Sequence, residues 1–355
     1  MAIRKRGKTW QIDYIDITGK RVRKSGFRTK IEAEHSLSLA KINRNKGITN
    51  IINREITIKT ASEYFLSKYA KLQCAKHTFD EYERIVLKSI IPFFYNMKVA
   101  DLSKIHVEEY RDYLIYKKNL ANTTVNKHLF VLSTIIEKQV ENGYIFINVV
   151  KKVNKLSATE SPAKALNDDE INILLSTAKS EMPDFYPIVL LALNTGLRRG
   201  EIVALKWENI DLKNNKINVK HSAYNGVLTK PKTKSSYRTL EIPSNLHNVL
   251  VKLKLKSYDN EFVFTNLNGN MLDPHKISSK LFPKLIKLSK LEHYRFHDLR
   301  HTFGSQLVCN GVNIKYVQVQ MGHSKIKTTL DIYGHLLSDV NEQAMNILNK
   351  VCSVS

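Results

Sequence analysis

The sequence has few cysteines and no long apolar run. Its three cysteines, Cys74, Cys309 and Cys352, are odd in number and far apart, which argues against a disulfide framework and against a cysteine-based zinc site. No apolar stretch approaches the roughly 20 residues that a membrane span requires, and no basic start is followed by an apolar signal core. We therefore expect a cytoplasmic protein whose cysteines are reduced and incidental.

Acidic residues are scarce relative to basic ones. The 33 Asp and Glu stand against 56 Lys and Arg, which leaves a formal net charge of +23 and indicates a polyanionic partner, with nucleic acid ahead of a membrane surface. The sequence also lacks paired carboxylates with two-metal spacing and a Walker GxxxxGK loop. We therefore expect no metal, no other cofactor and no nucleotide-driven activity.

The hydrophobic pattern divides the 355 residues into parts of different type, and the length itself exceeds one typical domain. Between residues 57 and 150, Thr60 and Thr78 each stand three residues before a Glu and are predicted to cap helices. We expect a multidomain α+β protein with a small N-terminal β-sheet-plus-helix module (residues 1–50), an all-α domain of about four helices (57–150), a Lys-rich linker (151–166), and a mixed, mainly α domain with a small β-sheet (167–355).

The first module carries basic residues on a predicted strand. Trp10, Ile12 and Tyr14 alternate with polar residues as a half-buried strand does, and Val22 begins a second strand. A helix is predicted to start at Thr29, which precedes Glu32 by three positions. The second strand supplies the candidate DNA-binding residues of this module, with a solvated charged hairpin as the alternative; they are Arg21, Arg23 and Lys24.

Two segments of the last domain carry cationic residues suited to phosphate binding. In TGLRRGE, Arg198 follows a glycine turn at a helix start, where backbone N–H groups favour an anion. Glu201 lies on the same helix face, and a surface ion pair is the alternative interpretation. In TKPKTKSSYRT, Lys230, Lys232 and Lys234 alternate onto one face of a predicted hairpin, which either contacts DNA or is a solvated strand edge.

Two further segments carry histidines and a tyrosine. In YRFHDLRHTFG, His297 and Arg300 lie on one helical face. His301 forms an i, i+4 pair with His297 that is able to bind zinc, but the neighbouring arginine and the lack of a third ligand argue against a metal. In MGHSKIKTTLDIYGH, Tyr333 follows His323 by ten positions. A tyrosine near a helix end is usually a packing residue, so Tyr333 alone indicates no function.

The four segments together supply the groups that one phosphodiester needs. Two arginines, a lysine and two histidines are donors suited to its non-bridging oxygens, and a tyrosine hydroxyl is able to attack its phosphorus. In their order along the chain these residues resemble the active-site pattern of the tyrosine recombinases, the family of phage integrases. The pattern consists of Arg198, Glu201 one turn later, Lys232, His297, Arg300, His323 and Tyr333.

The resemblance covers roughly residues 165–345 by motif and the whole chain by layout. Met321 stands where the family often has Leu, and the hairpin offers three lysines. Lys232 is preferred among them as the counterpart of the family's catalytic lysine because it precedes Thr233, while Lys230 and Lys234 are expected DNA contacts.

The resemblance implies an enzyme that cuts and rejoins DNA without a metal or ATP. Tyr333 would attack a scissile phosphate, forming a 3′-phosphotyrosyl link and releasing a 5′-hydroxyl. Arg198, Arg300 and His323 would bind the non-bridging oxygens. Lys232 would protonate the leaving oxygen, and His297 would assist as base or hydrogen-bond partner.

The resemblance also implies partners. They are double-stranded DNA at core and arm-type attachment sites of a mobile element such as a phage, a homotetramer acting through a Holliday junction, an excisionase and a host DNA-bending protein. A Xer-like chromosome or plasmid dimer resolvase, a topoisomerase and a non-catalytic DNA-binding regulator with the same fold are the alternatives. The tail after residue 337 would pack on a neighbouring subunit or close its own domain.

Overall fold

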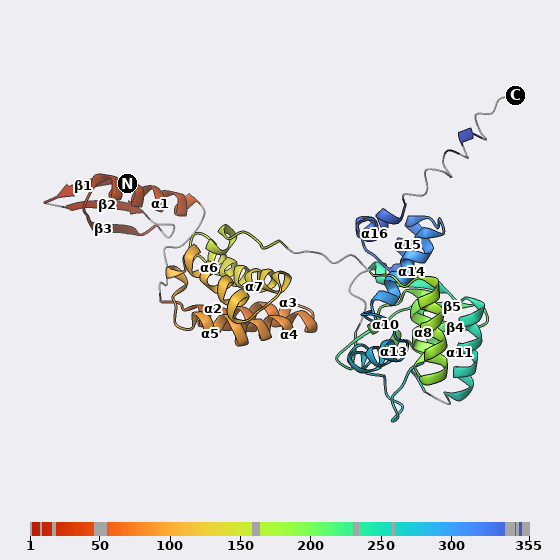
Figure 1. Cartoon of the computed structure of the whole chain (residues 1–355). Coiled ribbons are helices and arrows are strands. Elements are labelled where there is room, and N and C mark those ends of the chain that lie inside the picture. The colour runs from red at the N-terminus through yellow and green to blue at the C-terminus, as the bar shows by residue number, and fades with distance from the viewer. Residues whose placement is uncertain are drawn as a thin grey trace. The chain divides into compact units, whose positions relative to one another are not determined.

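The computed structural model describes residues 2–7, 9–15, 19–45, 55–157, 164–229, 234–257, 260–337, 345, 348 and 349. The chain divides into two compact units, Met1–Thr159 and Glu160–Ser355 (Figure 1). Within the described residues, no helix has both the length and the apolar character needed to cross a membrane.

The N-terminal module is an antiparallel sheet in the order β1-β2-β3 with one helix packed on it. Ile12 and Tyr14 are buried against the helix, as their alternation predicts. The helix begins where expected, because the Glu32 N–H donates to Thr29 Oγ1 at 3.2 Å and the Glu32 carboxylate accepts from the Thr29 N–H at 3.3 Å. Strand β1 was not predicted. The elements are β1 (Ala2–Arg6), β2 (Thr9–Ile15), β3 (Arg21–Phe27) and α1 (Lys30–Asn45).

The strand register sorts the basic residues onto two faces of this sheet. Arg23 pairs with Asp13 and Arg21 with Ile15, whereas Lys24 pairs with Ile12. Paired residues share a face, so Arg21 and Arg23 lie on the face opposite α1, while Lys24 lies on the helix-covered side. The three candidate DNA-binding residues of this strand therefore divide between the two faces, and their role in DNA binding stays a prediction.

The helical domain spans four helical stretches within residues 55–157, as predicted. The predicted caps are wrong. Thr57, not Thr60, is the N-cap, and its Oγ1 accepts from the Thr60 N–H at 3.2 Å; Ala75, not Thr78, precedes the second stretch. The stretches are α2 (Ile58–Tyr64) with the π-helix η1 (Phe65–Ala70) and α3 (Lys71–Gln73); α4 (Lys76–Ile85) with η2 (Val86–Ile90) and α5 (Ile91–Phe94); α6 (Lys104–Asp112) with η4 (Tyr113–Lys117); and α7 (Asn122–Glu141).

The segment expected as a linker contributes to both cores. Val153, which follows the 3₁₀ turn η5 (Val149–Lys152), is buried in the helical domain, and Leu166 is buried in the second unit. Apolar side chains inside the Lys-rich stretch therefore anchor its ends, and the free connection is shorter than residues 151–166.

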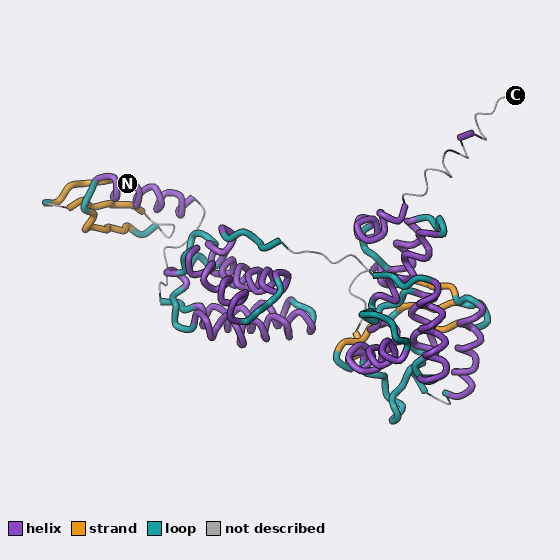
Figure 2. Tube along the Cα trace, in the orientation of Figure 1, coloured by secondary structure: helices purple, strands orange, loops and turns teal. Residues whose placement is uncertain are grey.

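The second unit is built around a helix that is apolar on all sides. Its inner helix, α9 (Tyr186–Thr195), buries Leu190, Leu191 and Ala192 among others, as expected of a helix surrounded by other elements. Small antiparallel strands and further helices pack against it, and Figure 2 shows that this unit is mainly helical with a few short strands. The elements are α8 (Asp168–Glu181), α10 (Arg199–Val203), the sheet β4 (Ile210–Asp211), β5 (Lys216–Val219) and β8 (Arg238–Glu241), the hairpin β6 (Ser222–Tyr224) and β7 (Val227–Thr229), α11 (Ser244–Lys256), and α12 (Pro274–Lys276) with η8 (Ile277–Leu281) and α13 (Phe282–Leu288).

A smaller core lies at the C-terminal helices α14 (Asp298–Cys309), α15 (Ile314–Met321) and α16 (Ile326–Tyr333), which precede a 3₁₀ turn, η9 (Gly334–Leu337). Four buried side chains form it, namely Val308, Val317, Met321 and Tyr333. The tail expected to pack in cis or in trans lies almost entirely outside the described residues.

Candidate active site

Arg198 lies at the start of helix α10, as predicted. Gly196 ends α9 with φ 61°, a left-handed conformation that suits glycine. The Glu201 carboxylate then accepts from the Arg198 N–H at 2.9 Å and from Arg198 Nη1 at 2.9 Å. The Arg198 side chain keeps 38% of its surface exposed, so the glutamate orients a guanidinium that solvent or a ligand can reach.

Glu201 has a second cationic partner that sequence reasoning missed. Arg238, on strand β8, donates from Nη2 to Glu201 Oε2 at 2.8 Å and from Nη1 to Oε1 at 3.2 Å. The two side chains are 2% and 4% exposed. Burial alone would raise the pKa of Glu201, but the bonds and charges of Arg238 and Arg198 lower it below its usual value. One carboxylate therefore holds two arginines.

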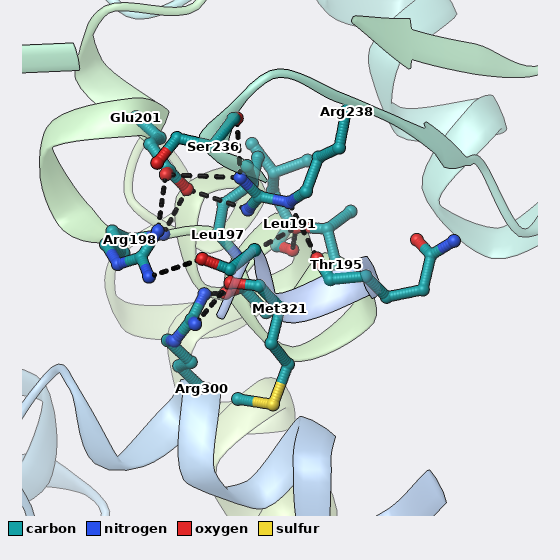
Figure 3. Close-up of polar contacts among 12 residues, drawn as sticks. Leu191, Thr195, Leu197, Arg198, Glu201, Ser236, Arg238, Arg300 and Met321 are labelled. Atoms are coloured by element: carbon teal, nitrogen blue, oxygen red, sulfur yellow. Dashed lines mark hydrogen bonds and ion pairs between the residues drawn. The ribbon is translucent and has the colours of Figure 1, made fainter. Parts of the chain in front are cut away.

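Three guanidinium groups converge on the C-terminal end of helix α15 (Figure 3). Arg238 Nε donates to the Gln320 carbonyl at 2.7 Å, Arg300 Nη2 to the Met321 carbonyl, and Arg198 Nη2 to the Gly322 carbonyl at 3.1 Å. Unpaired carbonyls and the negative end of the helix dipole favour cations at this position. The helix end therefore gathers three like charges that would otherwise repel each other.

Arg300 is the most deeply buried of the predicted cations, at 3% exposure. Its Nη1 donates to the Gly196 carbonyl at 2.6 Å, which joins the end of α9 to the end of α15. Burial and then the charge of Arg198 lower the pKa of Arg300 to about 9. The guanidinium therefore remains charged at neutral pH.

The two predicted histidines are neutral in this environment. Burial, followed by the neighbouring His301 and Arg300, lowers the pKa of His297 to about 4. Burial, followed by Arg300 and Arg198, lowers the pKa of His323 to about 3. At neutral pH each ring therefore carries one N–H and one acceptor nitrogen.

Tyr333 is buried, at 1% exposure, in the small C-terminal core. Its hydroxyl lies 3.2 Å from His301 Nδ1, and its ring packs against Gly304, where an added Cβ would lie 2.5 Å from Tyr333 Cζ. Burial raises the pKa of Tyr333 well above its usual value, and the charge of Arg300 opposes this effect. In this conformation Tyr333 is a packing residue whose hydroxyl remains protonated.

The structure thus brings Glu201 and five of the predicted catalytic residues into one region, around helices α10, α14, α15 and α16. The five are Arg198, His297, Arg300, His323 and Tyr333. Lys230 and Lys232 lie outside the described residues, and Lys234 begins a 3₁₀ turn, Lys234–Ser236. None of the described residues belongs to a group of His, Cys, Asp and Glu able to hold a metal ion.

Sequence reasoning missed three residues of this region, Arg238, His301 as a neighbour of the tyrosine, and Thr329. A signal existed for Arg238, since it shares the inward face of a strand with Leu240, and a buried arginine requires an acidic partner. Thr329 precedes Tyr333 by one helical turn, so the two share a face.

Three arginines gathered at one helix end, with the neutral His323 next to this end in the chain, form a cluster of donors of the kind that binds a phosphate group. Family models match two parts of the chain. The phage integrase family matches residues 164–339, and the phage integrase N-terminal SAM-like domain matches residues 57–115.

Known proteins are similar over most of the chain. A XerC-like tyrosine recombinase of Caldanaerobacter subterraneus is 28% identical, with 94% of this chain and 93% of the relative covered. The ICEBs1 integrase of Bacillus subtilis is 26% identical over 84% of each chain. The solved structure of the Tn1549 transposon integrase with circular intermediate DNA has a TM-score of 0.73 and 20% identity, covering 82% of this chain and 99% of that one.

The chain belongs to the phage integrase family of tyrosine recombinases, as the order of its motifs predicts. It is a site-specific DNA recombinase, and its multidomain α+β fold is that of the integrases.

Proposed function

We propose that this recombinase integrates and excises a mobile element, and that Tyr333 is its nucleophile. One observation carries the assignment. Arg198 and Arg300 donate to the carbonyls of the two residues that precede His323, and the helix that carries Tyr333 begins shortly after this turn. In the reaction a bond forms between Tyr333 Oη and phosphorus, and the bond from phosphorus to the 5′-oxygen breaks. The product is a 3′-phosphotyrosyl link, and reversal with a new 5′-hydroxyl rejoins the strands.

The cationic groups act where charge develops. Arg198 and Arg300 hold the two non-bridging oxygens, and His323 donates a further hydrogen bond, so that the pentavalent transition state is bound more tightly than the ground state. Two observations support these roles: the Arg198 side chain is partly exposed and can reach a phosphate, and Arg300 is held in place by its bond to the Gly196 carbonyl.

Proton transfer needs an acid and a base. Lys232 gives its proton to the leaving 5′-oxygen, while Lys230 and Lys234 bind phosphates beside it. The proton of Tyr333 passes toward His297, whose low pKa keeps it able to accept. Tyr333 must leave its buried position for this step, because its pKa there disfavours the phenolate.

The remaining parts of the chain bind DNA. The helical domain holds the core site, and the N-terminal sheet reads an arm-type site with the outer face that carries Arg21 and Arg23. The net charge of +23 supports both contacts. Four strands must be cut, so the active form is a tetramer on a Holliday junction. It works in the cytoplasm, with an excisionase and a host DNA-bending protein setting direction.

A dimer resolvase is the second candidate, because a relative named XerC-like matches this chain over 93% of its own length. An experiment to distinguish the integrase from the resolvase first needs DNA sites. They are selected from a random duplex library by their binding to full-length Tyr333→Phe. Two selected sites are then placed on one supercoiled plasmid, with and without the arm-type segment.

An integrase excises the intervening DNA only when the arm-type segment and a DNA-bending protein are present. Excision from core sites alone would support the resolvase and contradict the integrase. Relaxation without strand exchange would indicate a topoisomerase, and binding of the wild type without any cleavage would indicate a regulator.

A further inference from the structure

His323 has to present an N–H to a phosphate oxygen to play its proposed part. His323 is only 9% exposed, and burial, together with the nearby Arg300 and Arg198, lowers its pKa to about 3. The neutral ring carries only one proton, on Nδ1 or on Nε2. Which nitrogen carries it decides whether His323 attracts or repels the phosphate.

The Nδ1 edge of this ring has a partner on the tyrosine helix. Thr329 Oγ1 lies 2.9 Å from His323 Nδ1, and Thr329 is 0% exposed. The backbone of His323 is held separately, because Gln318 Nε2 donates to its carbonyl at 2.8 Å. The ring is therefore fixed on its Nδ1 side, which leaves Nε2 for a ligand.

Thr329 also belongs to the element that carries the nucleophile. It lies in α16, four residues before Tyr333, so both side chains are on the same face and both are buried. One hydrogen bond thus connects the helix of the tyrosine with a group proposed to bind the phosphate.

We propose that Thr329 is a positioning residue: its hydroxyl donates to His323 Nδ1, which places the ring proton on Nε2, where it binds a non-bridging oxygen. The inference rests on the proposed role of His323. A threonine hydroxyl can donate or accept. An incoming anion selects the arrangement in which Nε2 donates, since the other arrangement would point a lone pair at the phosphate. The same bond keeps α16 next to the phosphate while Tyr333 moves.

Valine at this position tests the hydroxyl with little change of shape. We expect Thr329→Val to slow single-turnover cleavage of a nicked suicide duplex about 10-fold to 100-fold, by analogy with the loss when a partner that orients a metal-bound histidine is removed. DNA affinity should change little, because Arg198, Arg300 and the rest of the DNA interface still bind while only the His323 hydrogen bond is weakened. Thr329→Ser, which retains a donor, should restore most of the rate. Thr328→Val, on the exposed side of the same helix, is the matched control and should cleave like the wild type.

A purely structural role would give the same kinetic loss, so two further readouts are needed. In ¹⁵N-histidine spectra, the His323 ring signals, identified by their loss in His323→Gln, should show the Nε2–H form in wild type and a shift toward Nδ1–H in Thr329→Val. The double variant Thr329→Val, His323→Gln should be no slower than His323→Gln alone.

Wild-type cleavage rates in Thr329→Val, or an equal slowing of Thr329→Val in the His323→Gln background, would overturn the inference while leaving the proposed function intact. If the wild type cleaves no selected duplex, the proposed function fails instead. In that case unchanged ring signals in Thr329→Val would still refute the link between Thr329 and the tautomer.

Discussion

A single methyl group at Gly304 tests whether the Tyr333 ring packs against helix α14 at this position. A Cβ at this position would lie 2.5 Å from Tyr333 Cζ and 2.6 Å from its hydroxyl oxygen. The ring must therefore shift by about 1 Å, and overpacking of this kind costs about 1–3 kcal/mol. Replacing glycine by alanine inside a helix gains about 1 kcal/mol. Gly304→Ala should thus destabilise the wild type by up to about 2 kcal/mol.

The sign of this effect should reverse when the ring is absent. In a Tyr333→Ala background only the helix gain remains, so Gly304→Ala should stabilise by about 1 kcal/mol. Trp10 and Trp207 are the two tryptophans, so urea unfolding in a Trp10→Phe background follows Trp207 in the recombinase unit. Equal effects of Gly304→Ala in both backgrounds would refute the buried position of Tyr333.

Three further predictions concern charge. Arg238→Met should cost about 3 kcal/mol of unfolding free energy, because it leaves the buried Glu201 with one partner fewer; adding Glu201→Gln should recover part of that loss, and no recovery would contradict the pairing. His128 is 5% exposed, and burial, followed by the charge of Arg84, lowers its pKa from 6.5 to about 4. Because only the unfolded state then binds a proton, the stability of the helical domain should be complete above pH 6.5 and fall as the pH drops toward 4. Amide exchange across α7 measures this fall, which His128→Gln should flatten. Arg23→Ala should weaken binding to the arm-type DNA and reduce its salt slope by about 1, whereas Lys24→Ala, on the opposite face, should do neither in anisotropy titrations.

The local structure around Arg198 was predictable because it depends only on neighbouring residues. The glycine turn before Arg198 and the one-turn spacing to Glu201 are properties of a few neighbouring residues. The fold class followed from hydrophobic periodicity in the same way. Such local patterns place each residue on an element, but not beside a distant one.

The features that were missed depend on distant contacts. Arg238 binds Glu201, 37 positions away, and Arg198 binds the Gly322 carbonyl, 124 positions away. Neither pairing can be recognised from one short segment of the sequence. Strand β1 is basic and carries no apolar alternation, and its pairing with β2 is what makes it a strand. The caps at Thr60 and Thr78 were wrong because each helix starts earlier in the chain: Thr57 caps the first, and the second starts after Ala75.

We propose that Tyr333 forms the covalent bond to DNA and needs no metal to do so. The direct measurement is a nicked suicide duplex, built from a selected core site, incubated with full-length protein in EDTA. Mass spectrometry of the SDS-resistant adduct should locate a 3′-phosphoryl group on Tyr333, and Tyr333→Phe should bind the duplex without forming the adduct. An adduct in Tyr333→Phe, or one located on another residue of the wild type, would contradict the account.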